Sequence, residues 1–153
     1  MEGERRASSG EFHGREHALA VRVYYEDTDF TGVVYHANYL RYFERGRSDF
    51  LRLAGIDHTA LLARGDPCAF AVTRIAVAFI KPARIDETLT VFTAYDSFRG
   101  ARLLISQRIG RGRETIASAD VEAVCIAPSG RPRRPPRDLV ELLAPRVLGL
   151  AAP

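Results

Sequence analysis

Apolar and polar positions follow two different periods along the chain, and together they predict one long helix among strands. From Tyr39 onward, apolar residues recur every three or four positions, which predicts an amphipathic helix with one buried face. This stripe consists of Tyr39, Phe43, Gly46, Phe50 and Leu53. Asn38 is a candidate N-cap for the helix, and Gly55 is well placed to end it.

Several other segments alternate apolar and polar residues, which is typical of strands with one buried face. These segments are 19–25, 69–80, 88–95, 101–109 and 114–126. Gly100 and residues 110–112 mark tight connections that favour hairpins between the last three. Short helices are expected at 59–64 and 138–143. A strand, a long helix and then four strands predict an α+β fold, in which a five-stranded antiparallel sheet packs on one main helix.

The length of 153 residues fits a single domain. Residues 1–17 are interpreted as a disordered N-terminal arm, 18–143 as the folded domain and 144–153 as a C-terminal tail. His13 and His17 fall in this arm and receive no role. One helix covers only one face of the sheet and leaves its edges open. We therefore expect the chain to form an oligomer.

Composition narrows the class of protein. The net charge of +3 comes mainly from arginines that are scattered along the chain, without any nucleic-acid-binding module, so no nucleic-acid partner is predicted. The two cysteines form no CxxC pair and have no histidine at metal-ligand spacing, so no metal site is expected. With no signal peptide and no apolar run near ~20 residues, we expect a cytoplasmic protein without membrane insertion.

The segment from Glu26 to Tyr39 joins a carboxylate-rich turn to the start of the long helix. A helix N-terminus offers unpaired N–H groups that can polarise a carbonyl oxygen. A nearby carboxylate could attack that carbonyl or deprotonate a water that does so. An Asp-x-Asp pair before a helix is, however, also typical of plain turn and capping chemistry. The local pattern leaves both interpretations open for Asp27 and Asp29.

A family resemblance adds to this pattern. The run Asp27-Thr28-Asp29, followed by Gly32-Val33-Val34-Tyr35-His36-Ala37-Asn38-Tyr39, resembles the signature of hotdog-fold thioesterases of the 4-hydroxybenzoyl-CoA thioesterase family. It is most similar to the acyl-CoA thioesterase branch associated with the bacterial Tol-Pal system, as are residues 22–26 and 43–47. The similarity covers about residues 19–140. It implies a hotdog fold, with a sheet wrapped around one long helix, and hydrolysis of an acyl-CoA substrate without metal or prosthetic group.

The resemblance also implies roles for single residues. Asp29 corresponds to the catalytic carboxylate, acting as nucleophile or general base, and the backbone N–H of Tyr35 or His36 to the group that polarises the thioester carbonyl. The imidazole of His36 is expected either to take part in catalysis or to orient substrate. The resemblance further implies a homodimer or homotetramer, with active sites at the subunit interface.

Three further residues are expected to bind substrate: Phe30, Gly32 and Tyr35. Phe30 occupies a position where related family members carry a small residue or proline. The resemblance therefore does not identify the acyl group of the substrate. Glu44 on the helix is a rival carboxylate, although a salt bridge with Arg41 or Arg47 would also explain it. His58 is interpreted as a solvated loop residue.

Two alternative functions stay open. One is another activity of the same fold, on aromatic acyl-CoA or on acyl-carrier-protein thioesters. The other is a non-catalytic acyl-binding or scaffold protein, against which the intact Asp29 motif argues.

Overall fold

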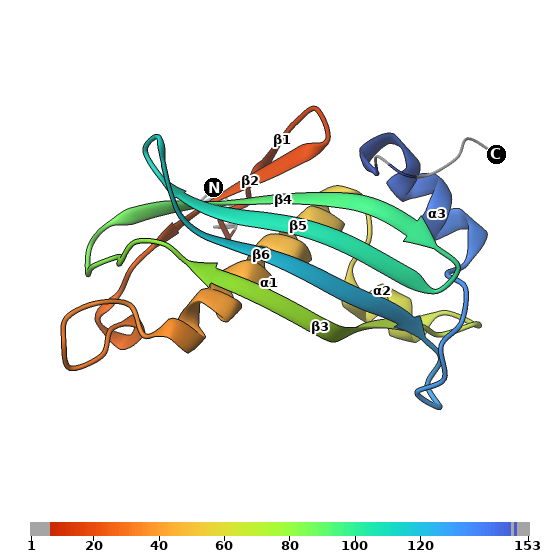
Figure 1. Cartoon of the computed structure of the whole chain (residues 1–153). Coiled ribbons are helices and arrows are strands. Elements are labelled where there is room, and N and C mark those ends of the chain that lie inside the picture. The colour runs from red at the N-terminus through yellow and green to blue at the C-terminus, as the bar shows by residue number, and fades with distance from the viewer. Residues whose placement is uncertain (1–6, 148, 150–153) are drawn as a thin grey trace, which may run out of the picture.

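One antiparallel sheet packs against a long helix in the computed structural model, which describes residues 7–147 and 149 (Figure 1). Within these residues the sheet has six strands in the order β1-β2-β4-β5-β6-β3. The strands are β1 (Glu11–His13), β2 (Glu16–Arg22), β3 (Ala69–Phe79), β4 (Thr88–Arg99), β5 (Arg102–Arg111) and β6 (Glu114–Ile126). The helices are α1 (His36–Leu53), α2 (His58–Ala63) and α3 (Arg137–Leu143), with 3-10 turns at Tyr25–Asp27 and Ala144–Arg146. In this part of the chain no helix is long and apolar enough to span a bilayer.

The predicted long helix is α1, which lies behind the sheet in Figure 1. Its buried face includes four of the five residues of the predicted stripe, but Leu53 is 40% exposed. Gly55 adopts φ +96° directly after the helix, as expected of a residue that ends one. The predicted cap is wrong: Tyr35 is the N-cap. Asn38 lies inside the first turn, and its side-chain Nδ2 donates to the Asp27 carbonyl at 2.8 Å.

The α+β prediction is confirmed, and the sheet carries β1 beyond the five expected strands. The first predicted strand, 19–25, is shifted, because β2 ends at Arg22 and the chain then turns. That turn is stabilised by the Asp27 carboxylate, which accepts the Tyr24 N–H at 2.8 Å. The inner faces of the central strands are buried as predicted, for example at Leu89, Leu103 and Ile105.

Ordered strands are present from Glu11 onward, inside the predicted disordered arm of residues 1–17. The predicted start of the folded domain at residue 18 is therefore wrong. Residues 11–13 and 16–22 form a hairpin that continues the sheet, and residues 1–6 of the predicted arm lie outside the described residues. The His17 side chain is fully buried, and its Nε2 lies 2.7 Å from Oδ2 of Asp49 on α1. The same Oδ2 accepts the Gly10 N–H at 2.8 Å. A long-range hydrogen bond thus fixes a segment whose local sequence is polar.

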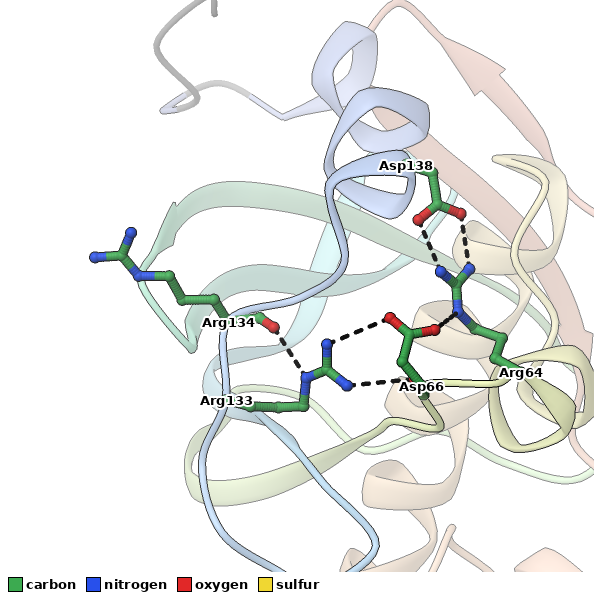
Figure 2. Close-up of polar contacts among 5 residues, drawn as sticks. All are labelled: Arg64, Asp66, Arg133, Arg134 and Asp138. Carbon is green, nitrogen blue, oxygen red and sulfur yellow. Dashed lines mark hydrogen bonds and ion pairs between the residues drawn. The ribbon is translucent and has the colours of Figure 1, made fainter.

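The C-terminal tail also packs on the domain, at least as far as Val147. Val147 is buried and bridges to Tyr95 of β4, whereas 148 and 150–153 lie outside the described residues. Residues 131–136, which are all proline or arginine, precede α3, and Figure 2 shows how this part of the chain is attached. Arg64, after α2, makes a bidentate contact with Asp138 at 2.7 and 2.8 Å and a third bond to Asp66. Arg133 also approaches Asp66, at 3.6 Å. These contacts hold α3 against α2.

Gly46 is the point of closest approach between α1 and the sheet. A Cβ atom there would lie 2.7 Å from Thr93 Oγ1 and 2.8 Å from Val91 Cγ1. We expect Gly46→Val to destabilise the fold by about 3 kcal/mol or more, because the helix must move away from a packed sheet. Urea unfolding followed by circular dichroism measures this. Ala37→Val, at an exposed position of the same helix, is the control and should cost less than ~1 kcal/mol.

Candidate active site at the start of the long helix

A tight loop between Thr28 and Val34 connects the Tyr25–Asp27 turn to α1. These two residues form an isolated antiparallel bridge, and the Asp29 N–H donates to the Val33 carbonyl at 2.9 Å. The Gly32 N–H returns to the Asp29 carbonyl at 3.0 Å, with Gly32 at φ +82°. A Cβ on Gly32 would meet nothing within 4 Å, so glycine is needed for its backbone conformation and not for space.

The Asp29 carboxylate is held within this loop by Thr31. Its Oδ1 accepts the Thr31 N–H at 2.8 Å and the Thr31 hydroxyl at 2.6 Å. These two bonds, opposed by slight desolvation, lower the pKa of the Asp29 carboxyl. The nearby His36 lowers it further. Within residues 7–147, no hydrogen bond engages Oδ2. Asp29 is therefore ionised at neutral pH and has one oxygen free.

Asp27 has a different environment from Asp29. It is buried, at 8% exposure, and its carboxylate is engaged by the Tyr24 N–H. Its carbonyl accepts both the Tyr35 N–H, at 2.9 Å, and the Asn38 side chain. Asp27 thus connects the turn to the first turn of α1. This geometry assigns a structural role to Asp27 and leaves Asp29 as the accessible carboxylate of the pair.

The start of α1 offers free backbone donors next to this carboxylate. The Tyr35 N–H is already used by Asp27, so of the two donors considered from the sequence only His36 is available. The N–H groups of His36 and Ala37 have no partner within the part of the chain that the structure describes. They lie at the positive end of an 18-residue helix. This pair of groups can polarise a carbonyl oxygen.

The other predicted site residues lie around the same end of α1. The rings of Tyr35 and His36 are 4.5 Å apart, and His36 also meets the edge of Phe79 at 6.1 Å. Phe79, at the end of β3, had no signal in the sequence that linked it to the site. Phe30 is fully exposed at the tip of the loop and contacts no core residue. Thr31 was likewise missed as a partner of Asp29, although the Asp-x-Thr spacing of an Asx turn could have identified it.

Glu44 and His58 do not join this loop. The Glu44 carboxylate accepts the Ser48 hydroxyl at 2.5 Å, and no salt bridge to Arg41 or Arg47 is present in residues 7–147. His58 is the first residue of α2, so the loop assignment is wrong, and its Nε2 lies 3.4 Å from Ser48 Oγ. These side chains line a cavity of about 180 Å³ between α1, α2 and the start of β3.

Comparison with known proteins defines the class. Residues 23–143 match the model of the thioesterase-like superfamily, and the chain belongs to this superfamily of hotdog proteins. The 4-hydroxybenzoyl CoA thioesterase of Pseudomonas sp. strain CBS-3 has the same fold, with a TM-score of 0.76 at 21% identity; the alignment covers 84% of this chain and 99% of that one.

Within this class, the chain is similar to acyl-CoA thioesterases called YbgC. It is 42% identical over 122 residues to the acyl-CoA thioester hydrolase YbgC of Escherichia coli O6:H1, covering 78% of this chain and 90% of the relative. A probable thioesterase from Bartonella henselae is 44% identical with a TM-score of 0.77, covering 79% of this chain and 99% of that structure. The family resemblance and the hotdog fold expected from the sequence are confirmed.

Proposed function

We propose that the chain hydrolyses acyl-CoA thioesters to a free acid and CoA, with Asp29 as the catalytic carboxylate. The observation that carries this proposal is an ionised carboxylate with a free oxygen, held beside unpaired N–H groups at a helix start. The thioesterase names of relatives at 42% and 44% identity support the choice of a thioester as the substrate.

In the proposed reaction, the N–H groups of His36 and Ala37 donate to the thioester carbonyl oxygen. Negative charge that develops on this oxygen is stabilised by these donors and by the helix dipole. Asp29 either attacks the carbonyl carbon with its free oxygen or takes a proton from the attacking water. In both routes the C–S bond breaks, and the CoA thiolate leaves and is protonated. If Asp29 itself attacks, water then hydrolyses the acyl–Asp29 anhydride, which releases the free acid and restores the carboxylate. These groups suffice without a metal or prosthetic group.

The side chains of His36, Tyr35 and Phe30 have supporting roles in this proposal. The His36 imidazole is exposed next to Asp29 and is free to orient the substrate or to protonate the leaving thiolate. Tyr35 and Phe30 supply exposed aromatic surface for the substrate. Gly32 contributes the turn that brings the Asp29 loop back toward the helix.

Release of free CoA tests this function. The purified chain should hydrolyse at least one member of a panel of acyl-CoA thioesters. Faster hydrolysis of the same acyl groups on acyl carrier protein would indicate that the carrier protein, and not CoA, is the natural carrier. A preference for the aromatic members of the panel would indicate the other alternative, an aromatic acyl-CoA thioesterase. If no thioester is hydrolysed although the protein is folded, it acts instead as an acyl-binding or scaffold protein.

We also propose that the protein works as a homodimer or homotetramer built on β3. This strand forms an edge of the sheet and pairs only with β6 within the described residues (Figure 1). Val72, Phe79 and Ile80 along this edge are about half exposed, at 48%, 52% and 54%. A long apolar edge favours pairing with a second chain. A second copy related by a two-fold axis would join the two β3 strands antiparallel.

Ala76→Lys, at an exposed position in the middle of β3, tests this assembly. We expect the mass in solution to fall to that of a monomer, because lysine on an edge strand opposes pairing. Val124→Lys, on the outer face of β6 inside the sheet, is the matched control and should keep the native mass. Light scattering with size-exclusion chromatography measures both. A wild-type protein that is already monomeric would contradict the proposed dimer.

The proposal includes a cytoplasmic location. The two cysteines, Cys68 and Cys125, are buried as free thiols, which supports a reducing compartment.

A further inference from the structure

The first turn of α1 is attached to the preceding turn at a single backbone group, the carbonyl of Asp27. This oxygen accepts the Tyr35 N–H at 2.9 Å and the side-chain Nδ2 of Asn38 at 2.8 Å. Among the residues that the structure describes, no other hydrogen bond joins this first turn to residues 24–29. The hydrogen-bonded attachment of the helix start to the segment that ends in Asp29 therefore consists of these two contacts.

The two contact points lie on either side of the donor pair of the candidate site. His36 and Ala37, whose N–H groups are unpaired among the described residues, lie between Tyr35 and Asn38 in the chain. A single hydrogen bond would leave the helix start free to rotate about that bond. A second bond, three residues further along, removes this freedom. Asn38 is therefore placed to fix the direction in which the two N–H groups point.

Asp27 is a firm anchor for these contacts. It is buried, and its carboxylate accepts the Tyr24 N–H at 2.8 Å. Tyr42, one helical turn after Asn38, lies fully buried beside it. Burial, and secondly the Asp27 carboxylate, raise the pKa of the Tyr42 hydroxyl, which therefore adds no second negative charge at neutral pH. The half-buried Asn38 side chain thus binds a carbonyl that the surrounding structure holds in place.

We propose that Asn38 is a positioning residue for the hydrolysis, whose side chain holds the N–H groups of His36 and Ala37 toward the thioester carbonyl. This inference rests on the proposed function. The contact of Asn38 is with the Asp27 carbonyl, so it acts on the reaction through the backbone. Backbone donors stabilise an oxyanion only when they are already aimed at the place where it forms. A displacement of about 1 Å can cost roughly a hundredfold in rate.

Asn38→Asp and Asn38→Leu test this role. Both side chains have nearly the size of asparagine, but neither an ionised carboxylate nor an alkyl group can donate a hydrogen bond to the Asp27 carbonyl. We expect kcat to fall about tenfold to a hundredfold in both variants, because the backbone donors lose their fixed direction. KM should stay within about threefold of wild type, since the lost interaction acts in the transition state. Free-CoA release at several substrate concentrations gives both constants.

Melting temperatures separate this role from a merely structural one. A carboxylate in the first turn of a helix is favoured by the helix dipole, whereas leucine gains nothing from it. Asn38→Asp should therefore be the more stable of the two variants, although both lose kcat to a similar extent. If kcat followed the melting temperature instead, or stayed within about threefold of wild type in both variants, the proposal would be overturned.

Arg41→Gln is the matched control for the charge that Asn38→Asp introduces. It also lowers the net charge by one, at an exposed position of the same helix, and it leaves both contacts of the Asp27 carbonyl intact. Its kcat should therefore stay close to that of wild type.

A measurement without substrate tests the positioning itself. Tyr35-His36 is the only Tyr-His step in the sequence, so tyrosine labelled with ¹³C at its carbonyl and histidine labelled with ¹⁵N single out the His36 N–H. Its NMR signal should move or broaden in Asn38→Asp and Asn38→Leu, and stay close to its wild-type place in Arg41→Gln. An unchanged signal in the Asn38 variants would overturn the positioning role. A wild-type protein that cleaves no thioester would overturn the proposed function instead.

Discussion

Asp29→Asn should lower kcat for acyl-CoA hydrolysis about a thousandfold, equivalent to roughly 4 kcal/mol of transition-state stabilisation. Asparagine has nearly the same shape, and its side-chain oxygen can still accept the two hydrogen bonds from Thr31. The loop should therefore keep its conformation. The amide, however, is a poor nucleophile and cannot take a proton from water. The loss should be in kcat with little change in KM, measured by free-CoA release at saturating substrate.

Asp27→Asn is the matched control for this substitution. Its amide oxygen can still accept the Tyr24 N–H, and the backbone carbonyl that holds Tyr35 is unchanged. We expect its kcat to stay within about tenfold of wild type. Equal melting temperatures for wild type and Asp29→Asn would exclude unfolding as the cause of the rate loss. If Asp29→Asn kept the full rate, Glu44 would become the carboxylate to test next.

Asp49→Ala should cost about 3–5 kcal/mol of folding stability, because it leaves the buried His17 ring and the Gly10 N–H without their shared hydrogen-bond acceptor. His17 is fully buried, and its Nε2 has only the Asp49 carboxylate as partner among the described residues. Its Nδ1 already has no hydrogen-bond partner in residues 7–147. Without Asp49, the ring would be left among Phe12 and Phe50 with both nitrogens unpaired. The Gly10 N–H would lose its acceptor as well.

The melting temperature should fall by about 10 °C, since ~1 kcal/mol corresponds to 2–4 °C at this chain length. Asp57→Ala is the control, because Asp57 also accepts a backbone N–H, from Ala60, but at an exposed helix start. It should cost only about 1 kcal/mol. Urea unfolding gives both values. A loss for Asp49→Ala no larger than that for Asp57→Ala would mean that the hairpin is held by apolar packing alone.

Local sequence determined the elements and the class of the protein. The three-to-four spacing from Tyr39 gave the position of α1, since a helix that buries one face must repeat with its own period. Period-two alternation gave the central strands in the same way. Gly55 ended the helix as predicted, because left-handed backbone favours glycine. The ordered run from Asp27 to Tyr39 identified the family, which the matches to known thioesterases confirmed.

The tertiary structure decided what depends on residues far apart in the chain. His17 lies in a polar segment without a visible partner, and only the fold brings Asp49 to it across 32 residues. Asn38 looked like a cap, but its side chain donates to the Asp27 carbonyl instead. The Tyr35 N–H donates to the same carbonyl, so it is not free to bind a substrate carbonyl. Phe79 reaches His36 from the end of β3. Periodicity reports which face of an element is buried, whereas such contacts depend on how the elements are packed together.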